Sequence, residues 1–309
     1  MTTSASANPL FIAGPTGVGK SEVAMILAER IKGEIITVDS MQVYRGLNVG
    51  TAKPSEADQA RVPHHLLDIC RLEEPFDAAR FVQCARQAVE TILERGRVPV
   101  FCGGTGLYFK AWLEGLGNAP PGSAELRAEL ESTPLDSLVA ELEKGDPEAY
   151  SLMDLKNPRR VVRAVEVLRL TGKPFSKQRA VWQSDMAGKV TNGLFILSRS
   201  TEDLHARIRG RVEKMFQNGL VEETRQLLTQ GLAFNRTAMQ AIGYRQVVEG
   251  LAQGESLAMM KEKVTIRTRQ FARRQWIWFR KHARGIQLEI PPDQTTNETA
   301  ERILQEWTV

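Results

Sequence analysis

Short apolar runs alternate with amphipathic segments in the first third of the chain. Apolar runs of strand length lie at residues 9–13, 34–38, 66–69 and 98–102, and segments with helical spacing lie at residues 20–31 and 77–95. Because buried strands that alternate with helices are typical of a parallel sheet with crossover connections, this pattern predicts an α/β fold. A further helix is predicted to follow the fourth strand and to end near residue 114.

After residue 116 the pattern loses its strands. Pro120-Pro121-Gly122 interrupts the chain, and short helical segments follow as far as residue 189. The clearest of these helices begins after Asn157, which suits an N-cap position because Pro158 can occupy the first helical position. We therefore expect residues 117–189 to form a helical insertion.

The last part of the chain returns to the sheet and then becomes mainly helical. A fifth strand is expected at residues 192–198 and a short sixth strand at residues 286–290. Helices are expected at about residues 201–217, 219–230, 236–253, 255–283 and 295–307. On this pattern, residues 9–116 and 190–309 form one α/β core, which the insertion interrupts.

The composition is that of a soluble globular protein, with 42% hydrophobic and 25% charged residues. No apolar run approaches the roughly 20 residues of a membrane span, and the first residues lack the basic and apolar regions of a signal peptide. The three cysteines are far apart among apolar neighbours, which favours buried thiols in a reducing compartment and argues against a structural zinc site. We expect a cytoplasmic monomer that does not bind membranes.

Positive charge is concentrated near the C-terminus. Residues 261–284 contain nine Lys or Arg and the single acid Glu262, a charge of +8, whereas the whole chain carries +4. A solvated helix face is the ordinary explanation of such a run, but its size favours a polyanionic partner. A second basic cluster lies in the insertion, at Arg159, Arg160 and Arg163. Two separate clusters fit a folded RNA better than a short peptide.

The first apolar run ends in a phosphate-binding loop. The loop has the spacing G-x-x-x-x-G-K-[ST] between a strand and a helix, and it consists of Gly14, Pro15, Thr16, Gly17, Val18, Gly19, Lys20 and Ser21. Its glycines let backbone N–H groups turn toward an anion, and the helix N-terminus adds partial positive charge. Lys20 can reach an outer phosphate, and Ser21 or Thr16 can offer a hydroxyl to a phosphate or to Mg²⁺. An ordinary glycine-rich turn is the alternative, and the complete spacing argues against it.

Two other predicted strands end in polar motifs. Asp39 follows the second strand, and Gly103-Gly104-Thr105 follows the fourth. Because ligands bind at the carboxyl ends of strands in open parallel sheets, we expect these motifs to meet the phosphate loop. Asp39 could be a general base, a carboxylate linked to Mg²⁺ or a turn cap. The Gly-Gly-Thr motif could form a second backbone nest with a hydroxyl at the ligand, or only a tight turn.

The choice of ligand for the phosphate loop depends on two arginines and on two kinase motifs that the sequence lacks. Arg207 and Arg211 share one face of a predicted helix, where they could clamp a diphosphate or pair with acids such as Glu202. Apart from the second strand, no strand ends in an acid as a Walker B strand would, and no arginine-rich lid of a nucleotide kinase is recognisable. The loop therefore suits a diphosphate leaving group. A small-molecule or nucleotide kinase and a non-catalytic RNA-binding ATPase module remain the alternatives.

Eight motifs occur in one order along the chain. They are residues 14–21, Val38-Asp39-Ser40-Met41-Gln42-Val43-Tyr44, Gly50-Thr51-Ala52-Lys53-Pro54, His64-His65-Leu66-Leu67-Asp68, Gly103-Gly104-Thr105-Gly106-Leu107-Tyr108, Asn157-Pro158-Arg159-Arg160, Gln240-Ala241-Ile242-Gly243-Tyr244-Arg245 and Arg269-Gln270-Phe271-Ala272-Arg273-Arg274-Gln275. From about residue 9 to residue 280 this ordered set resembles the tRNA dimethylallyltransferase (tRNA isopentenyltransferase) family. The phosphate loop alone is shared with many unrelated enzymes, whereas the ordered set is specific. A C-terminal zinc finger, common in eukaryotic members, is missing, which favours the compact bacterial type.

The resemblance implies a P-loop NTPase-like parallel sheet flanked by helices, and an enzyme that acts on tRNA. The implied reaction moves a dimethylallyl group from dimethylallyl diphosphate to N6 of adenosine 37, beside the anticodon, and releases diphosphate. The loop at residues 14–21 then holds the diphosphate together with Mg²⁺. Ser21 is the implied metal-site residue, for a Mg²⁺ ion that is bound via the diphosphate. Asp39 is the implied base at N6, Thr105 lies at the reacting centre, and Arg211 is favoured over Arg207 as the residue that neutralises the diphosphate.

The resemblance also implies contacts with the tRNA anticodon stem-loop. The residues that would make them are Asp39, Ser40, Met41, Gln42, Thr105, Arg127, Arg159, Arg160, Val161, Val162, Arg163, Gln240, Ala241, Ile242, Gly243, Tyr244 and Arg245. Arg127 has the weakest support in this set, because the sequence around it is poorly patterned.

Overall fold

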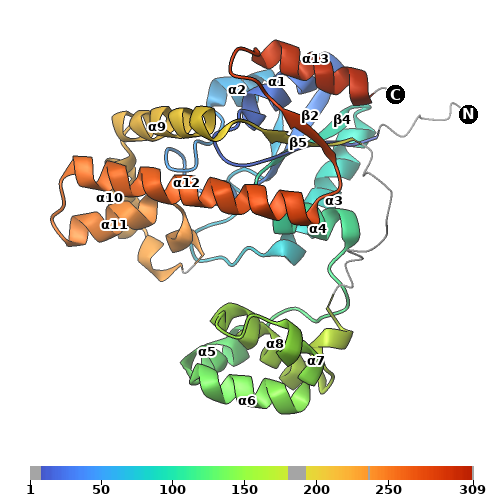
Figure 1. Ribbon diagram of the computed structural model, residues 1–309, viewed down its shortest axis with the longest axis vertical. Coiled ribbons are helices and arrows are strands. Elements are labelled where there is room, and N and C mark those ends of the chain that lie inside the picture. Colours follow the sequence, from blue (N-terminus) through green and yellow to red (C-terminus); the bar gives the residue numbers. More distant parts are fainter. Residues whose placement is uncertain (1–7, 180–192, 236, 308–309) are drawn as a thin grey trace, which may run out of the picture. The chain divides into compact units, whose positions relative to one another are not determined.

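The computed structural model describes residues 8–179, 193–235 and 237–307. The chain divides into two compact units, of which the first comprises Met1–Lys110 and Met186–Val309 and the second comprises Ala111–Asp185. The first unit contains a sheet with helices around it, as Figure 1 shows. The α/β class expected from the sequence is thus confirmed. None of the described helices is both long enough and apolar enough to cross a membrane.

A parallel sheet forms the centre of the first unit. Its strand order is β3-β2-β4-β1-β5-β6, and every pair of neighbours is parallel. The strands are β1 (Leu10–Ala13), β2 (Gly33–Val38), β3 (His64–His65), β4 (Val98–Gly103), β5 (Leu194–Ser198) and β6 (Ile286–Glu289). Because β2, β4 and β1 are consecutive in this order, the segments that follow them emerge side by side.

The first unit also contains helices, some of which pack against the sheet while others lie beyond it (Figure 1). They are α1 (Lys20–Ile31), α2 (Glu56–Arg61), α3 (Ala78–Glu94), α4 (Gly106–Glu114, whose residues after Lys110 belong to the second unit), α9 (Thr201–Gln217), α10 (Leu220–Thr229), α11 (Tyr244–Ala252), α12 (Leu257–His282) and α13 (Thr296–Trp307), with the 3-10 turns η2 (Leu232–Phe234) and η3 (Ala238–Gln240). The helix expected at residues 20–31 has those bounds as α1, and the α9 bounds also match the expected ones.

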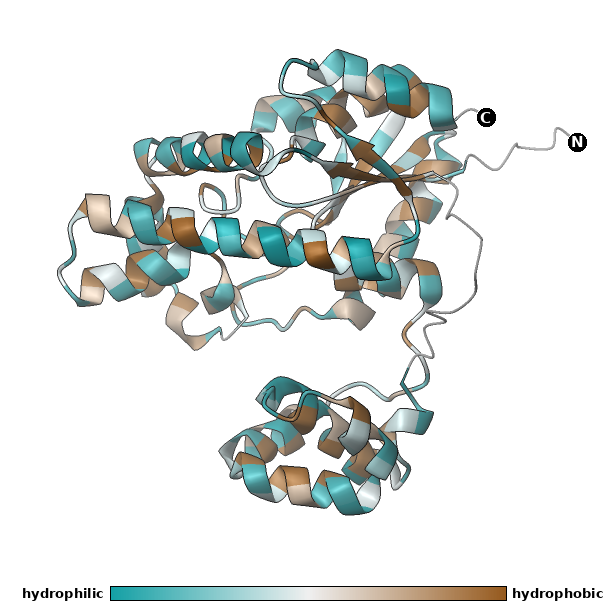
Figure 2. Ribbon diagram, in the orientation of Figure 1, coloured by the Kyte–Doolittle hydropathy of each residue, from teal (hydrophilic) through white to brown (hydrophobic). Residues whose placement is uncertain are grey.

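The core follows from the apolar positions that predict these elements. Leu10 of β1, Leu27 of α1 and Ile303 of α13 belong to one cluster and are fully buried. On the opposite face of β1, Phe11 stacks on Phe101 of β4 with the ring centroids 4.9 Å apart. Figure 2 shows apolar residues concentrated along the strands. Burial on both faces explains why the strands are continuous apolar runs instead of alternating ones.

The described part of the second unit is helical. It contains α5 (Ala124–Ser132), α6 (Leu135–Gly145), α7 (Pro147–Leu152), α8 (Pro158–Thr171) and the 3-10 turn η1 (Phe175–Lys177). As expected, Asn157 caps α8 and Pro158 is its first residue. Leu138 and Leu142 of α6 pack with Val161 and Val165 of α8 in a small separate core. This unit therefore buries an apolar core of its own.

The structure corrects two of the expected elements. The third strand is β3 at His64–His65 and not at residues 66–69, because Leu66 and Asp68 have positive φ angles of 65° and 54°, which a strand cannot adopt. The helix expected at residues 236–253 is interrupted, since Gly243 has a φ angle of 101° and α11 begins only after it. Residues 180–192, which include the predicted end of the insertion and the predicted start of the fifth strand, lie outside the described residues.

Gly103 is the residue at which we expect a small substitution to damage the fold. A Cβ atom at Gly103 would lie 2.1 Å from the carbonyl oxygen of Val38 in the neighbouring strand, and that backbone atom cannot move away without breaking the sheet. We expect Gly103→Ala to lower the free energy of unfolding by about 1–3 kcal/mol or more. The measurement is urea unfolding followed by circular dichroism. Gly210→Ala is the control, because nothing lies within 4 Å of that position in α9 and helix propensity favours alanine; a control as unstable as Gly103→Ala would contradict this account.

Candidate active site

Three polar motifs meet at the carboxyl edge of the sheet. In the register of the sheet, Gly103 at the end of β4 lies opposite both Ala13 of β1 and Val38 of β2. The phosphate loop, Asp39 and the Gly-Gly-Thr motif follow these three strand ends directly. The meeting of the three motifs that the sequence predicts is therefore confirmed.

The loop has the backbone geometry of an anion cradle. Gly14 has a φ angle of 146°, and a Cβ atom there would lie 2.6 Å from the carbonyl oxygen of Leu197, so only glycine fits. Gly19 precedes α1 in the left-handed conformation, and no side chain caps the N-terminus of this helix at that position. The first N–H groups of α1 are thus left for an anion, as the N-termini of helices at phosphate sites require.

Lys20 is held at the centre of this cradle. Its ammonium group donates a hydrogen bond of 2.8 Å to the carbonyl oxygen of Pro15. Burial, helped by repulsion from Arg211, lowers the pKa of Lys20 to about 8, although Cys102 and Asp39 act in the opposite direction. Beside it, burial raises the pKa of the Cys102 thiol to about 12, so this thiol is neutral at ordinary pH. Lys20 is therefore a desolvated cation that an anionic ligand would stabilise.

Three arginines from the segment after β5 surround the loop, and backbone carbonyl oxygens hold each of them. Arg207 Nε donates to Gly17 O at 2.9 Å, and Arg211 Nη2 donates to Thr51 O at 3.0 Å. Neither arginine pairs with Glu202 in the described residues. The sequence interpretation missed Arg199, whose Nε donates to Val18 O at 2.9 Å. Its position directly after a strand of the sheet was the available signal.

Arg211 is the arginine best placed for a ligand. Its Nε atom is buried and has no hydrogen-bond partner among the described residues. Burial lowers the pKa of its guanidinium group, while Asp39 and Glu22 favour the charged form. By contrast, Arg199 is neutralised by Asp203, with Nη1 2.7 Å from Oδ2. A buried donor without a partner is costly, so Arg211 favours an anionic acceptor.

Asp39 is the turn cap that was one of the roles considered for it, and one of its carboxylate oxygens is left open. Its Oδ1 atom accepts hydrogen bonds from Met41 N at 2.8 Å and from Gln42 N at 3.3 Å, which is the geometry of a turn cap. No hydrogen bond to Oδ2 is found among the described residues, so this oxygen is open to a proton donor. Thr105 Oγ1 lies next to this turn and accepts a hydrogen bond of 3.2 Å from Ser40 N.

Comparisons with known proteins agree with this geometry. A family model described as IPP transferase matches residues 42–282. The tRNA dimethylallyltransferase 1 of Citrifermentans bemidjiense is 42% identical over 283 residues, which cover 91% of this chain and 92% of that protein.

The chain belongs to the IPP transferase family.

Other relatives extend this similarity to solved structures. The tRNA dimethylallyltransferase of Salinispora arenicola is 43% identical, over 88% of this chain and 80% of that protein. The crystal structure of a tRNA isopentenylpyrophosphate transferase from Bacillus halodurans has a TM-score of 0.69, with 33% identity over 97% of both chains. A eukaryotic dimethylallyltransferase acting on tRNA has a TM-score of 0.77, with 27% identity over 96% of this chain and 78% of that one. The resemblance noted from the sequence motifs is thus confirmed.

In this member of the IPP transferase family, the motif at residues 240–245 is largely internal. Ala241 and Tyr244 are buried, and the hydroxyl of Tyr244 donates to Glu223 Oε1 at 2.6 Å. Arg245 is exposed and pairs with Glu249 at 2.8 Å. Of this motif, Gln240 and Arg245 are exposed and could contact a partner, while Tyr244 holds the segment in place.

The predicted tRNA-binding residues of the second unit also differ in exposure. Val161 and Val162 lie in the core of that unit. Arg127 Nη2 and Arg163 Nη1 both donate to the buried carboxylate of Glu166, at 2.8 Å and 2.6 Å. The side chains of Arg159 and Arg160 are exposed at the first turn of α8, and that turn is where an anion is favoured by the helix dipole.

The residues of the loop fit a magnesium ion that is held mainly by a substrate. No group of three or more His, Cys, Asp or Glu side chains that could hold a metal occurs among the described residues. Mg²⁺ commonly keeps several waters and binds through phosphate oxygens with few protein ligands. Ser21 is exposed on the first turn of α1, where its hydroxyl can supply one such ligand.

The lowered pKa of Lys20 predicts how diphosphate binding depends on pH. Because only the protonated amine attracts the ligand, affinity is retained below pH 8 and is lost as pH rises through the pKa of about 8. Between pH 7.5 and pH 9, where the diphosphate group of dimethylallyl diphosphate is close to fully ionised, we expect the affinity for this ligand to fall by about a factor of ten. Isothermal titration calorimetry would measure this decrease.

Lys20→Arg is the matched control for this prediction. A guanidinium group stays charged throughout this range, so affinity in the variant should change little with pH. Equal slopes in the parent enzyme and in the variant would contradict the assignment to Lys20.

Proposed function

We propose that the protein transfers a dimethylallyl group from dimethylallyl diphosphate to N6 of adenosine 37 in tRNA and releases diphosphate. Membership of the family supports a prenyltransferase that acts on tRNA. The observation that carries the finer proposal is that the cationic phosphate loop after β1 and a carboxylate, Asp39 after β2, lie at the same edge of the sheet with only β4 between their strands. A binding site for the leaving group and a proton acceptor thus lie at one edge of the sheet.

The chemistry proceeds as one displacement. The adenine N6 amine is a weak nucleophile because its lone pair is delocalised into the ring. As N6 bonds to the allylic C1 carbon and the C1–O bond breaks, the open Oδ2 atom of Asp39 takes the N6 proton. The electron pair of the broken bond goes to the diphosphate, whose charge Lys20, Arg211 and the loop N–H groups stabilise.

Magnesium belongs to this proposal as a substrate-bound ion. Bound through Ser21 and the diphosphate, Mg²⁺ would add positive charge where the leaving group develops negative charge. Because one chain carries the loop, Asp39 and Arg211, we further propose that it works as a monomer, in the cytoplasm where tRNA is found. A kinase is less well supported, because among the described strands only β2 is followed by an acid near the loop, and that acid is Asp39.

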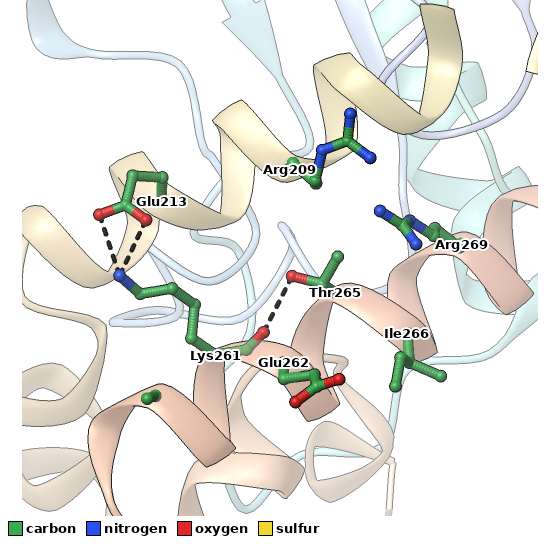
Figure 3. A pocket seen from close by; sticks show the side chains of 8 residues that line it. Arg209, Glu213, Lys261, Glu262, Thr265, Ile266 and Arg269 are labelled. Carbon is green, nitrogen blue, oxygen red and sulfur yellow. Dashed lines mark hydrogen bonds and ion pairs between the residues drawn. The ribbon is translucent and has the colours of Figure 1, made fainter. Parts of the chain in front are cut away.

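Helix α12 supplies a surface for the tRNA backbone. A groove of about 430 Å³ runs between α9 and α12 and is lined by Arg209, Lys261 and Arg269 among others (Figure 3). Glu213 neutralises Lys261 at 2.8 Å, and Figure 3 shows the side chains of Arg209 and Arg269 extending toward each other across the groove. The buried Nε atom of Arg269 has no partner among the described residues.

These features make the end of the groove at Arg209 and Arg269 suited to a phosphate of the RNA backbone. Phosphate contacts of this kind would help to repay the few kcal/mol needed to extrude the target base from its stack.

Removal of the Asp39 carboxylate tests the proposed reaction. We expect the parent enzyme, incubated with Mg²⁺ and unmodified tRNA, to transfer label from dimethylallyl diphosphate to adenosine 37, as a nuclease digest would reveal. Asp39→Ala should lower this rate by about 10²–10⁴-fold while tRNA affinity is retained. Absence of label in tRNA with the parent enzyme would refute the proposed function. Equal losses of rate and tRNA affinity in the variant would refute the role of Asp39 as a base.

The arginine pair in the groove predicts a change in salt dependence. The double variant Arg209→Gln with Arg269→Gln should bind tRNA more weakly. The negative slope of the logarithm of the association constant against the logarithm of the salt concentration should become shallower by about one for each phosphate that the protein no longer binds. Fluorescence titration at several salt concentrations gives both quantities. Arg302→Gln on α13 is the control, since Arg302 bonds only to Glu289 O and Gln294 Oε1 among the described residues. An unchanged slope in the double variant would show that no phosphate binds there.

A further inference from the structure

Gln275 is a polar residue within the buried stripe of α12. The stripe contains Val264, Thr268, Ala272 and Phe279, and the Gln275 side chain is 9% exposed. A buried amide must satisfy both its donor and its acceptor, which makes its partners informative. Neither partner of Gln275 lies on α12.

The Gln275 amide bridges two of the strand-end motifs. Its Oε1 atom accepts a hydrogen bond of 2.9 Å from Thr16 N in the phosphate loop, and its Nε2 atom donates one of 2.8 Å to Gly104 O. Because Thr16 N–H is a donor and Gly104 C=O an acceptor, only this orientation of the amide satisfies both groups. The side chain therefore ties the loop to the Gly-Gly-Thr motif.

The same hydrogen-bond chain continues to Asp39. Gly104 N and Thr105 N both donate to Val38 O at 3.2 Å, directly before Asp39. Thr105 Oγ1 accepts from Ser40 N, directly after it. A continuous polar path thus runs from the phosphate loop through Gln275 and Gly104 to the backbone on both sides of Asp39.

Gly104 is shaped for this contact. A Cβ atom at Gly104 would lie 2.3 Å from Nε2 of Gln275. The close approach of the amide therefore depends on glycine at this position, which is the middle residue of the motif. A side chain that served only to fill space in the α12 stripe would need no such complementary gap.

We propose that Gln275 is a positioning residue, which sets the distance between the phosphate loop and the segment that contains Asp39 together with Thr105. Gln275 lies on α12, the helix that also carries the proposed tRNA-binding surface. This inference rests on the proposed function. The leaving group must align with the incoming amine to within fractions of an ångström, and small misplacements at a reacting centre can cost about 10²-fold in rate. Gln275 makes no contact with the reacting atoms in this account.

Gln275→Leu tests the proposal with an apolar side chain of similar size. We expect the single-turnover rate of dimethylallyl transfer to fall about 10–100-fold, with the dissociation constant for tRNA changed less than about threefold. Gln226→Leu is the matched control, because Gln226 is exposed on α10. An unchanged transfer rate in Gln275→Leu overturns the proposal, and so does a tRNA affinity that falls as much as the rate.

The variant Gln275→Glu tests the proposal through the pH dependence of the transfer rate, which a purely structural role of Gln275 would not change. A glutamate can accept from Thr16 N at any pH, but it can donate to Gly104 O only when protonated. The transfer rate of this variant, divided by that of the parent enzyme, should therefore rise as pH falls from 8 to 6. A ratio that stays constant with pH contradicts the proposal.

Hydrogen exchange separates this inference from the proposed function. Peptides that cover residues 14–21 should exchange about tenfold faster in Gln275→Leu than in Gln226→Leu, because the loop loses its link to α12. This result does not depend on which reaction the enzyme performs. Unchanged exchange overturns the link even if the parent enzyme transfers label to tRNA, whereas faster exchange in an enzyme that transfers no label refutes the proposed function alone.

Discussion

Mutual repulsion between cations is the constraint on which this site depends. Lys20, Arg199, Arg207 and Arg211 converge on one loop, and a protein without a ligand must hold them there against their repulsion. Each of the four donates a hydrogen bond to a backbone carbonyl oxygen, namely those of Pro15, Val18, Gly17 and Thr51. Among the described residues, only Arg199 of these four also has a carboxylate partner, Asp203. The charges of Lys20, Arg207 and Arg211 are thus fixed in place without a carboxylate that neutralises them, which is the arrangement that a diphosphate requires.

The sheet topology brings the rest of the chemistry to these cations. With β4 between β1 and β2, the Gly-Gly-Thr motif lies between the loop and Asp39. Its glycines allow the backbones to approach, and its threonine hydroxyl meets the turn at Asp39. Helix α12 then connects this edge to a basic surface through Gln275. In the proposed function, the same helix would bind the tRNA and hold the loop that binds the leaving group.

Local sequence patterns predicted much of this architecture. The strand–loop–helix unit around Gly14–Ser21 and the polar ends of β2 and β4 were predictable because each depends on neighbouring residues. The misplaced third strand and the broken helix before α11 depend on single positive φ angles, at Leu66 and Gly243, which apolar periodicity does not reveal. Arg199 and Gln275 contact the loop across 181 and 259 residues of sequence. The position of Arg199 after a strand was a signal that it lies at this edge of the sheet, but no local pattern predicts the contact of Gln275 with the loop. The burial of Tyr244 within a recognisable motif could not be predicted from the local sequence either.

The central claim is that the loop holds a leaving diphosphate and not a phosphoryl donor. The most direct test follows diphosphate release during transfer to unmodified tRNA, with dimethylallyl diphosphate and Mg²⁺, in the presence and absence of ATP. The account predicts one diphosphate released for each dimethylallyl group that enters tRNA, at the same rate without ATP and with no ATP hydrolysed. Transfer that requires ATP, or release of ATP γ-phosphate in step with transfer, would contradict it.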